Sequence, residues 1–360
     1  MARFDQNRPY NDLPTLPPKQ EVETPRVLKK AISASRALGE FQAHEQLRNA
    51  TDALVMSIGM QEAKHSSEIE NIVTTNDDLY QSMEKDSVIS DPLVKEVVGY
   101  LDAVWHGHAE LRRGRSLGTS LIREIVSIVL GKSLGIRTEP GTRLRNPTGD
   151  VLYAPPEGEA LLNALLDNLS DYWADDAGHD PLVKMAVGHY QFEAIHPFVD
   201  GNGRTGRILN VLYLVSAGLL QHPVLFLSRY IIEHKTDYYL MLSAVTERNE
   251  WEEWTLYVLD AVETTARRSI AMLERLAEAN ERADTIAANQ MAQGYSKELV
   301  SLVFQKPVTR ISHVVDAGLA KRRTASLYLQ ELERIGLLES RKHGRNTLYV
   351  NNTLLKILTE

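Results

Sequence analysis

The stretch HPFVDGNGRTGR, residues 196–207, decides how this chain is expected to fold. It lies between two segments whose apolar residues recur with helical periodicity. Pro197 disfavours helix at the residue before it, so the upstream helix should end at His196. Gly201 and Gly203 let the backbone take positive φ and approach a ligand closely. The stretch therefore predicts two helices joined by a glycine-rich turn.

This turn has the chemistry of a phosphate-binding site. Backbone N–H groups at a glycine turn and at a helix N-terminus attract anions. Arg204 and Arg207 are three residues apart in the next helix, so their guanidinium groups point the same way, and each can bind a phosphate through two hydrogen bonds. Asp200 offers an oxygen ligand suited to Mg²⁺. His196 titrates near neutral pH, which suits a general base. A solvated loop would explain one Gly-x-Gly but not this convergence.

HPFVDGNGRTGR resembles, without a mismatch, the signature of the Fic (Fido) family, His-x-Phe-x-Asp/Glu-Gly-Asn-Gly-Arg-x-x-Arg. The resemblance implies a helical Fic core that transfers AMP from ATP to a Ser, Thr or Tyr hydroxyl of a target protein. It implies that His196 deprotonates this hydroxyl and that Asp200 holds Mg²⁺ between the α- and β-phosphates. A sister family that transfers phosphate has Lys where this chain has Gly203, which favours AMP transfer.

The resemblance also implies the ATP-binding residues. Asn202 and the backbone from Gly201 to Gly203 would hold the α- and β-phosphates, Arg204 the phosphate chain, and Arg207 the γ-phosphate. Two aromatic residues open a YYLML segment that borders the adenine pocket in relatives, although aromatic residues on a buried helix more commonly belong to the core. The predicted set is Asp200, Gly201, Asn202, Gly203, Arg204, Thr205, Gly206, Arg207, Tyr238 and Tyr239.

A second motif, SSEIEN at residues 66–71, lies far upstream. Ser66 and Glu70 are four apart, hence on one helical face, and Asn71 suits a left-handed C-terminal cap. Alone this pattern is typical of a solvated face. Beside the Fic signature it resembles the family's inhibitory motif, Ser/Thr-x-x-x-Glu-Gly/Asn, which implies that Glu70 pairs with Arg207 in place of the γ-phosphate. The same glutamate could instead position a water that removes AMP.

Composition fits a soluble globular protein. The 360 residues include 40 Lys+Arg and 48 Asp+Glu, a net charge of −8, with 43% hydrophobic and 24% charged residues. Cysteine is absent, which excludes disulfides, Cys-zinc sites and thiol nucleophiles. No run approaches the roughly 20 apolar residues of a membrane span. The N-terminus lacks the pattern of a secretory signal, so the expected location is the cytoplasm.

The expected fold class is mainly α. Four parts are predicted: an N-terminal helical region with the inhibitory motif over 1–111, a Fic core over 112–262, a helical connector over 263–295, and a winged helix-turn-helix over 296–360. Five prolines make the first 25 residues loop-like. Gly141 to Tyr153, with a turn at 146–149, reads as a hairpin at the place of the family's flap, where a target segment would add as a strand. An ordinary surface hairpin is the alternative.

The last part differs from the rest in charge. Residues 296–360 carry a net charge of +5 and the remaining chain −13. Three helices, the third over Thr324 to Arg334, precede a second hairpin at His343-Gly344, which is the order of a winged helix. The basic side chains that could contact DNA phosphates are Arg322, Arg323, Arg341, Lys342 and Arg345.

The sequence does not decide every binding partner of the chain. Glu331 and Glu333 argue against DNA, and winged helices also serve as dimer or target-docking modules. The expected partners are ATP and an unidentified target protein, with no membrane; self-modification, a homodimer and DNA are alternatives. Two other functions remain: a DNA-binding regulator whose Fic core only senses nucleotide, and a hydrolase that removes AMP. The intact His196 argues against a pure sensor, because a sensor has no use for a base.

Overall fold

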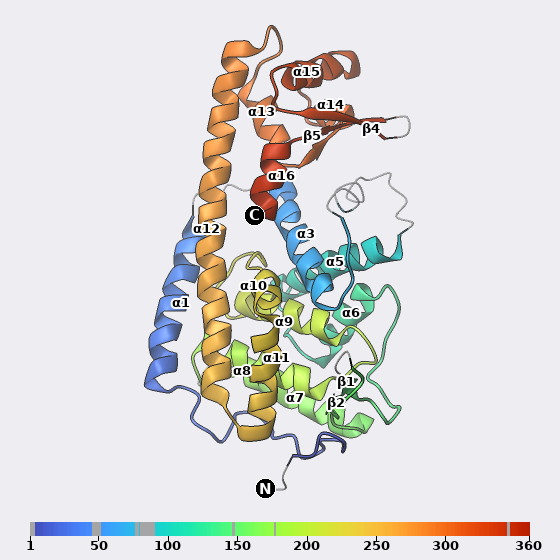
Figure 1. Cartoon of the computed structure of the whole chain (residues 1–360), viewed down its shortest axis with the longest axis vertical. Coiled ribbons are helices and arrows are strands. Elements are labelled where there is room, and N and C mark those ends of the chain that lie inside the picture. The colour runs from blue at the N-terminus through green and yellow to red at the C-terminus, as the bar shows by residue number, and fades with distance from the viewer. Residues whose placement is uncertain are drawn as a thin grey trace. The chain divides into compact units, whose positions relative to one another are not determined.

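The computed structural model describes residues 4–44, 52–75, 79, 91–145, 148–175, 178–343 and 346–360. It is mostly helical with two small antiparallel sheets, which confirms the predicted fold class (Figure 1). The chain divides into two compact units. The first comprises Met1–Gln42, Glu62–Val73 and Ser90–Arg267, and the second comprises Ala43–Gln61, Thr74–Ile89 and Arg268–Glu360. Among the described residues, none of the helices combines the length and apolar character that crossing a bilayer requires.

The first unit contains the two predicted helices joined by the glycine-rich turn, and most of the other helices. Two of its helices, α3 and α12, continue into the residues of the second unit. The elements are α1 (Pro25–Ala43), α3 (Asp52–Ile69), α5 (Pro92–Arg112), α6 (Thr119–Val129), β1 (Leu144–Arg145), β2 (Val151–Tyr153), α7 (Glu159–Ala174), α8 (Pro181–Ile195), α9 (Asn202–Ser216), α10 (Ser228–Glu233), α11 (Lys235–Arg248) and α12 (Trp251–Gln290).

Two adjacent helices, α8 and α9, form the centre of this unit. Asp180 caps α8, accepting the Leu182 N–H at 2.9 Å, and Pro181 occupies the first helical position. Apart from Glu193, every residue of α8 from Leu182 to Ile195 is buried. Such a helix has no solvent face, so it must be enclosed by other elements. α7, α9 and the start of α12 pack around it.

The N-terminal segment is irregular, as its prolines predict. Leu13, Leu16 and Val22 are nevertheless buried. The side chain of Asn168 on α7 accepts from the Leu16 N–H at 2.7 Å and donates to the Leu16 carbonyl at 3.0 Å. Nearer the N-terminus, the Tyr10 N–H donates to the Ala154 carbonyl at 2.9 Å, immediately after β2. The segment is therefore bound to α7 and to the base of the hairpin.

The predicted hairpin is present. β1 and β2 pair antiparallel, with Leu144 opposite Tyr153. Asn146 and Pro147 of the predicted turn lie outside the described residues. α12 continues as one helix through residue 262, where the core was expected to end. The four domain boundaries stay predictions.

The second unit contains the C-terminal module. Its sheet has the order β3-β5-β4, all antiparallel. The predicted three helices and hairpin are present, and the winged-helix assignment itself stays a prediction. Gly344 and Arg345 lie outside the described residues. The elements are α13 (Lys297–Val303), β3 (Val308–Thr309), α14 (Ile311–Asp316), α15 (Arg322–Arg334), β4 (Glu339–His343), β5 (Asn346–Val350) and α16 (Asn352–Thr359).

Three details of this module differ from the sequence expectation. α15 begins at Arg322, two residues before the predicted start at Thr324, because the two arginines already have helical geometry. β3 and α16 were not predicted. β3 has only two residues, too few for an alternating pattern, and α16 packs Leu354, Ile357 and Leu358 into the core.

Candidate active site

The loop between α8 and α9, together with the first two turns of α9, holds the predicted catalytic and phosphate-binding residues. α8 ends at Ile195, and His196 follows in a left-handed conformation with φ 48°. Arg137 fastens the loop from outside. Its Nε donates to the His196 carbonyl at 2.8 Å, and its backbone N–H donates to the Pro197 carbonyl at 2.9 Å. The backbone that carries the histidine is therefore held in place.

Asn202 fastens the same loop from inside. It is buried, its Oδ1 accepts the Phe198 N–H at 2.9 Å, and its Nδ2 donates to the Phe198 carbonyl at 2.8 Å. Both polar groups of its side chain thus hold the turn, and the phosphate contact that the resemblance implied for Asn202 stays a prediction. Gly201 precedes α9 with φ 78°, the left-handed conformation that its glycine predicts.

The imidazole of His196 is half-buried. Burial lowers its pKa to about 4, and the positive charge of Arg137 acts in the same direction. The ring is therefore neutral at neutral pH and able to accept a proton.

Arg204, in the first turn of α9, lies between two carboxylates. Its Nη1 donates to Glu96 Oε2 at 2.8 Å and its Nη2 to Asp200 Oδ1 at 3.3 Å. The arginine side chain is only 3% exposed, so these carboxylates neutralise a buried charge. Glu96 comes from α5 and was not predicted.

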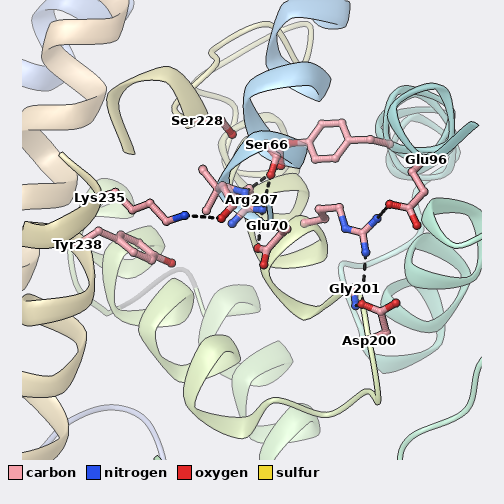
Figure 2. Close-up of polar contacts among 12 residues, drawn as sticks. Ser66, Glu70, Glu96, Asp200, Gly201, Arg207, Ser228, Lys235 and Tyr238 are labelled. Atoms are coloured by element: carbon pink, nitrogen blue, oxygen red, sulfur yellow. Dashed lines mark hydrogen bonds and ion pairs between the residues drawn. The ribbon is translucent and has the colours of Figure 1, made fainter. Parts of the chain in front are cut away.

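Arg207 is bound by the end of α3 (Figure 2). Its Nε donates to Ser66 Oγ at 2.8 Å, and its Nη2 donates to the Ser66 carbonyl at 2.8 Å and to Glu70 Oε1 at 2.9 Å. Burial raises the pKa of Glu70, but the charge and hydrogen bond of Arg207 outweigh it, and the net pKa is lowered. The ion pair between Glu70 and Arg207 that the motif implied is thus present in the structure.

The cap of α3 is also as predicted. Asn71 has φ 64°, and the next N–H, from Ile72, donates to the Ser67 carbonyl at 3.0 Å. Lys235 Nζ donates to the Ile69 carbonyl at 2.7 Å. These contacts satisfy the last carbonyls of the helix and fix the direction of the glutamate between them.

Two glycines of α9 make room for carboxylates. A Cβ at Gly203 would lie 2.3 Å from Glu70 Oε1, and one at Gly206 would lie 2.4 Å from Glu193 Oε1. Burial raises the pKa of Glu193 to about 7, against the opposing charge of Arg207. Thr205, between the two glycines, is fully buried.

The two tyrosines predicted to border adenine differ. Tyr238 is 3% exposed, and its hydroxyl lies 2.9 Å from His189 Nε2 within an aromatic cluster that includes Trp254. It is a core residue, the alternative that the sequence left open. Tyr239 is 43% exposed, and its adenine contact stays a prediction.

Asp200 is the residue available for Mg²⁺. Its side chain is 58% exposed, and its Oδ1 accepts from Arg204 and from the Gly201 N–H at 2.6 Å. The described residues contain no group of three or more His, Cys, Asp or Glu that could hold a metal. A single carboxylate fits Mg²⁺ that arrives with substrate phosphates, since this ion is commonly bound through one or two carboxylates and phosphate oxygens.

Sequence reasoning missed Glu96, Arg137 and Glu193. Glu96 contacts Arg204 of α9 from 108 residues away along the chain and Arg137 contacts His196 from 59 residues away, and no local pattern connects these pairs. Glu193 did have a signal, because it precedes His196 by three residues and so lies one helical turn upstream.

Three family models match parts of this chain. Residues 116–214 match the Fic/DOC family, residues 28–109 the Fic/DOC family N-terminal region, and residues 279–354 the C-terminal domain of SoFic-like protein adenylyltransferases. The chain belongs to the Fic/DOC family. The three matches follow one another along the chain without overlapping.

Individual relatives cover parts of the chain. Protein adenylyltransferase fic-1 of Caenorhabditis briggsae is 30% identical over 125 residues, 34% of this chain and 23% of the relative. A probable protein adenylyltransferase of Aquifex aeolicus is 28% identical over 158 residues, 43% of this chain and 47% of the relative. The chain thus spans less than half the length of these relatives.

Solved structures show the same fold. A Fic family protein from Desulfovibrio desulfuricans superposes with a TM-score of 0.60 at 19% identity, over 93% of this chain and 98% of the other. A fragment of Fic-1 from Caenorhabditis elegans superposes with a TM-score of 0.54 at 23% identity, over 69% of this chain and 73% of the other.

Proposed function

We propose that this chain is a protein adenylyltransferase that transfers AMP from ATP, bound with Mg²⁺, to a Ser, Thr or Tyr hydroxyl of a target protein. One observation carries the proposal. A neutral, half-buried His196 lies in the loop that leads into α9, and two buried arginines lie in the first two turns of that helix. The names of the curated relatives support the same reaction.

In this reaction the target hydroxyl oxygen forms a bond to the α-phosphorus, and the bond between that phosphorus and the oxygen bridging to the β-phosphate breaks. The hydroxyl proton passes to a ring nitrogen of His196, and pyrophosphate leaves. Arg204 and Arg207 stabilise negative charge on the phosphates, and the N-terminus of α9 adds its partial positive charge. Mg²⁺ on Asp200 would neutralise charge between the phosphates.

We also propose that the site is autoinhibited by Glu70, and we call this contact the brake. Arg207 cannot present its Nε and Nη2 groups to a γ-phosphate while Ser66 and Glu70 occupy them. An ionised Glu70 would also repel the phosphate at close range. ATP bound under these conditions would lack its γ-phosphate contact and lie unproductively.

Replacing Glu70 tests both the transfer reaction and the brake. With ATP labelled at the α-phosphate, E70G and E70Q are expected to incorporate at least about 10-fold more AMP than the unaltered protein, since ΔΔG of about 1.4 kcal/mol corresponds to tenfold. E68Q is the matched control, because Glu68 lies on the same helix and pairs with Lys64 at 3.8 Å. If E70G incorporates no more AMP than the unaltered protein, the proposed brake is wrong. If no variant incorporates AMP, either onto itself or onto the proteins of a lysate, the result argues against a transferase.

The hydrolase alternative uses the same carboxylate differently. If Glu70 positions a water, the unaltered protein should release AMP from a target that E70G has modified, and E70G should not. Mass spectrometry of the modified target before and after incubation separates this role from a simple brake.

A second candidate function, DNA binding, rests on the C-terminal module. Arg322 and Arg323 at the start of α15 are exposed and form no ion pair within the described part of the chain. Both arginines line a hollow of about 510 Å³. Side chains of these types contact DNA phosphates and base edges. The hollow is lined by Ile311, Arg322, Arg323, Ser326, Leu327 and Gln330.

Fluorescence anisotropy with a labelled duplex at several salt concentrations tests this candidate. R322A/R323A should weaken binding and reduce the slope of log K against log salt by about 2. R334A is the control, because Arg334 lies at the other end of α15 and pairs with Glu331 at 2.9 Å. Absence of salt-dependent binding at low salt would exclude DNA as the partner.

A further inference from the structure

Arg204 and Arg207 are both paired with carboxylates, but through different parts of the guanidinium group. An arginine has two hydrogen-bonding sides: Nε and Nη2 share one edge, and Nη1 lies beyond it. In Arg207 the Nε–Nη2 edge is fully used, by Ser66 and Glu70. In Arg204 it is Nη1 that is bound to Glu96, at 2.8 Å.

The Nε–Nη2 edge of Arg204 is incompletely satisfied. Nη2 has one contact with Asp200 at 3.3 Å, longer than most charge-assisted hydrogen bonds. Nε is buried and has no hydrogen-bond partner among the described residues. A buried guanidinium N–H without a partner is costly, and a two-oxygen anion on this edge would satisfy both donors at once.

Glu96 is well placed to hold the other side. It lies in the second turn of α5, whose start is fixed by Pro92 and by Asp91, which accepts the Leu93 N–H at 2.8 Å. Val94 and Val97 on either side of Glu96 are buried. The carboxylate therefore projects from a rigid helix, whereas Asp200 sits on a loop with a side chain 58% exposed (Figure 2).

We propose that Glu96 is a positioning residue for nucleotide binding: it holds Nη1 of Arg204 so that the Nε–Nη2 edge faces the phosphates of the substrate. The assignment rests on the proposed function. When phosphates arrive, Asp200 gives up Nη2 and the phosphate oxygens take Nε and Nη2, while Glu96 keeps Nη1. Glu70 competes with phosphate for its arginine; Glu96 does not compete, since it occupies the opposite side.

The two glutamates should therefore respond oppositely to substitution. Loss of Glu70 should raise AMP transfer, and loss of Glu96 should lower it. In the E70G background, E96A is expected to reduce kcat/KM for ATP by about 10-fold or more, mainly through KM, and E96Q by less, because Gln retains an oxygen acceptor for Nη1. E110Q is the matched control on the same helix, where Glu110 pairs with Arg115 at 2.9 Å.

Binding measurements separate positioning from general damage to the fold. By calorimetry, E70G/E96A should bind ATP at least about 10-fold more weakly than E70G and bind adenosine equally well, since adenosine has no phosphate for Arg204 to contact. A variant with a damaged fold would lose affinity for both ligands. Equal ATP affinity with and without Glu96 would overturn the proposal, and so would higher transfer in E96A, which would make Glu96 a second brake.

The same experiment distinguishes this inference from the function on which it rests. If E70G transfers AMP but its Glu96 variants match it in ATP affinity and KM, only the positioning role fails. If E70G neither binds ATP nor transfers AMP, the proposed function fails and the role of Glu96 fails with it. If E70G binds ATP without transfer, the calorimetric comparison alone decides for or against Glu96.

Discussion

α9 and α15 both carry two arginines in their first turn or two, yet the structure places these side chains in opposite environments. Arg204 and Arg207 of α9 are 3% and 2% exposed, and each is paired with a carboxylate. Arg322 and Arg323 of α15 are exposed and without an ion pair among the described residues. The two arginine pairs have similar positions in their helices and the same residue type, and they differ in how deeply they are buried.

Burial decides what each pair of arginines can bind. A guanidinium group taken out of water needs a neutralising partner, and the arginines of α9 find theirs in Glu70, Glu96 and Asp200 from neighbouring segments. Its site is suited to a small, highly charged anion. Exposed arginines need no partner, and salt screens their charge over about a Debye length. They are suited to an extended polyanion, or to solvent.

The largest effect expected from this comparison is on chemistry. In the E70G background, H196A should lower the rate of AMP transfer by about 10²- to 10⁴-fold, the usual contribution of a general base. ATP affinity should be retained, because the arginines of α9 are untouched. The rate is measured by incorporation of label from ATP labelled at the α-phosphate.

A histidine of the other unit provides the control. His313 on α14 accepts the Arg310 N–H at 3.2 Å and belongs to the C-terminal module. H313A should leave AMP transfer unchanged. A loss as large as that of H196A would show that transfer depends on the C-terminal module, and the contrast between the two regions would fail.

Local patterns were enough to predict the loop before α9 and the ion pair between Glu70 and Arg207. The signature has all its residues within one turn and the following helix, and the Ser66–Glu70 pair lies on one helical face. The contacts that complete the site were not predictable in this way. Arg137 reaches the loop from a distant irregular segment and Glu96 reaches Arg204 from α5, and only the packed fold brings them there.

The sequence also left open whether a polar or aromatic side chain of a motif faces a ligand or the interior of the fold. The resemblance implied a phosphate contact for Asn202, which stays a prediction, whereas the hydrogen bonds of its side chain to the backbone of Phe198 were not foreseen. Tyr238 was expected at the adenine pocket or in the core, and its hydrogen bond with His189 places it in the core. A polar side chain in a motif can serve a ligand or the loop itself, and spacing does not distinguish the two.

The second effect, of intermediate size, is on stability. R204A leaves Glu96 and Asp200 facing each other without the cation between them, which should cost about 1–3 kcal/mol, less than a fully buried pair because both carboxylates are partly exposed. R322A removes an exposed, unpaired side chain and should leave the midpoint of thermal unfolding nearly unchanged. Differential scanning calorimetry of both variants makes the comparison. Equal midpoints for R204A and the unaltered protein would mean that burial of Arg204 contributes no measurable stability.

The smallest effect is on the pH dependence of transfer. Burial also lowers the pKa of His196, in the loop before α9, to about 4. A lowered pKa keeps the ring deprotonated, so the base is lost only as pH falls toward that value. In E70G, kcat/KM should vary less than about twofold between about pH 6 and 8, whereas a solvated histidine of ordinary pKa would give about a fourfold rise. A fourfold rise over this range would place His196 in water and contradict the enclosed site on which the contrast with α15 depends.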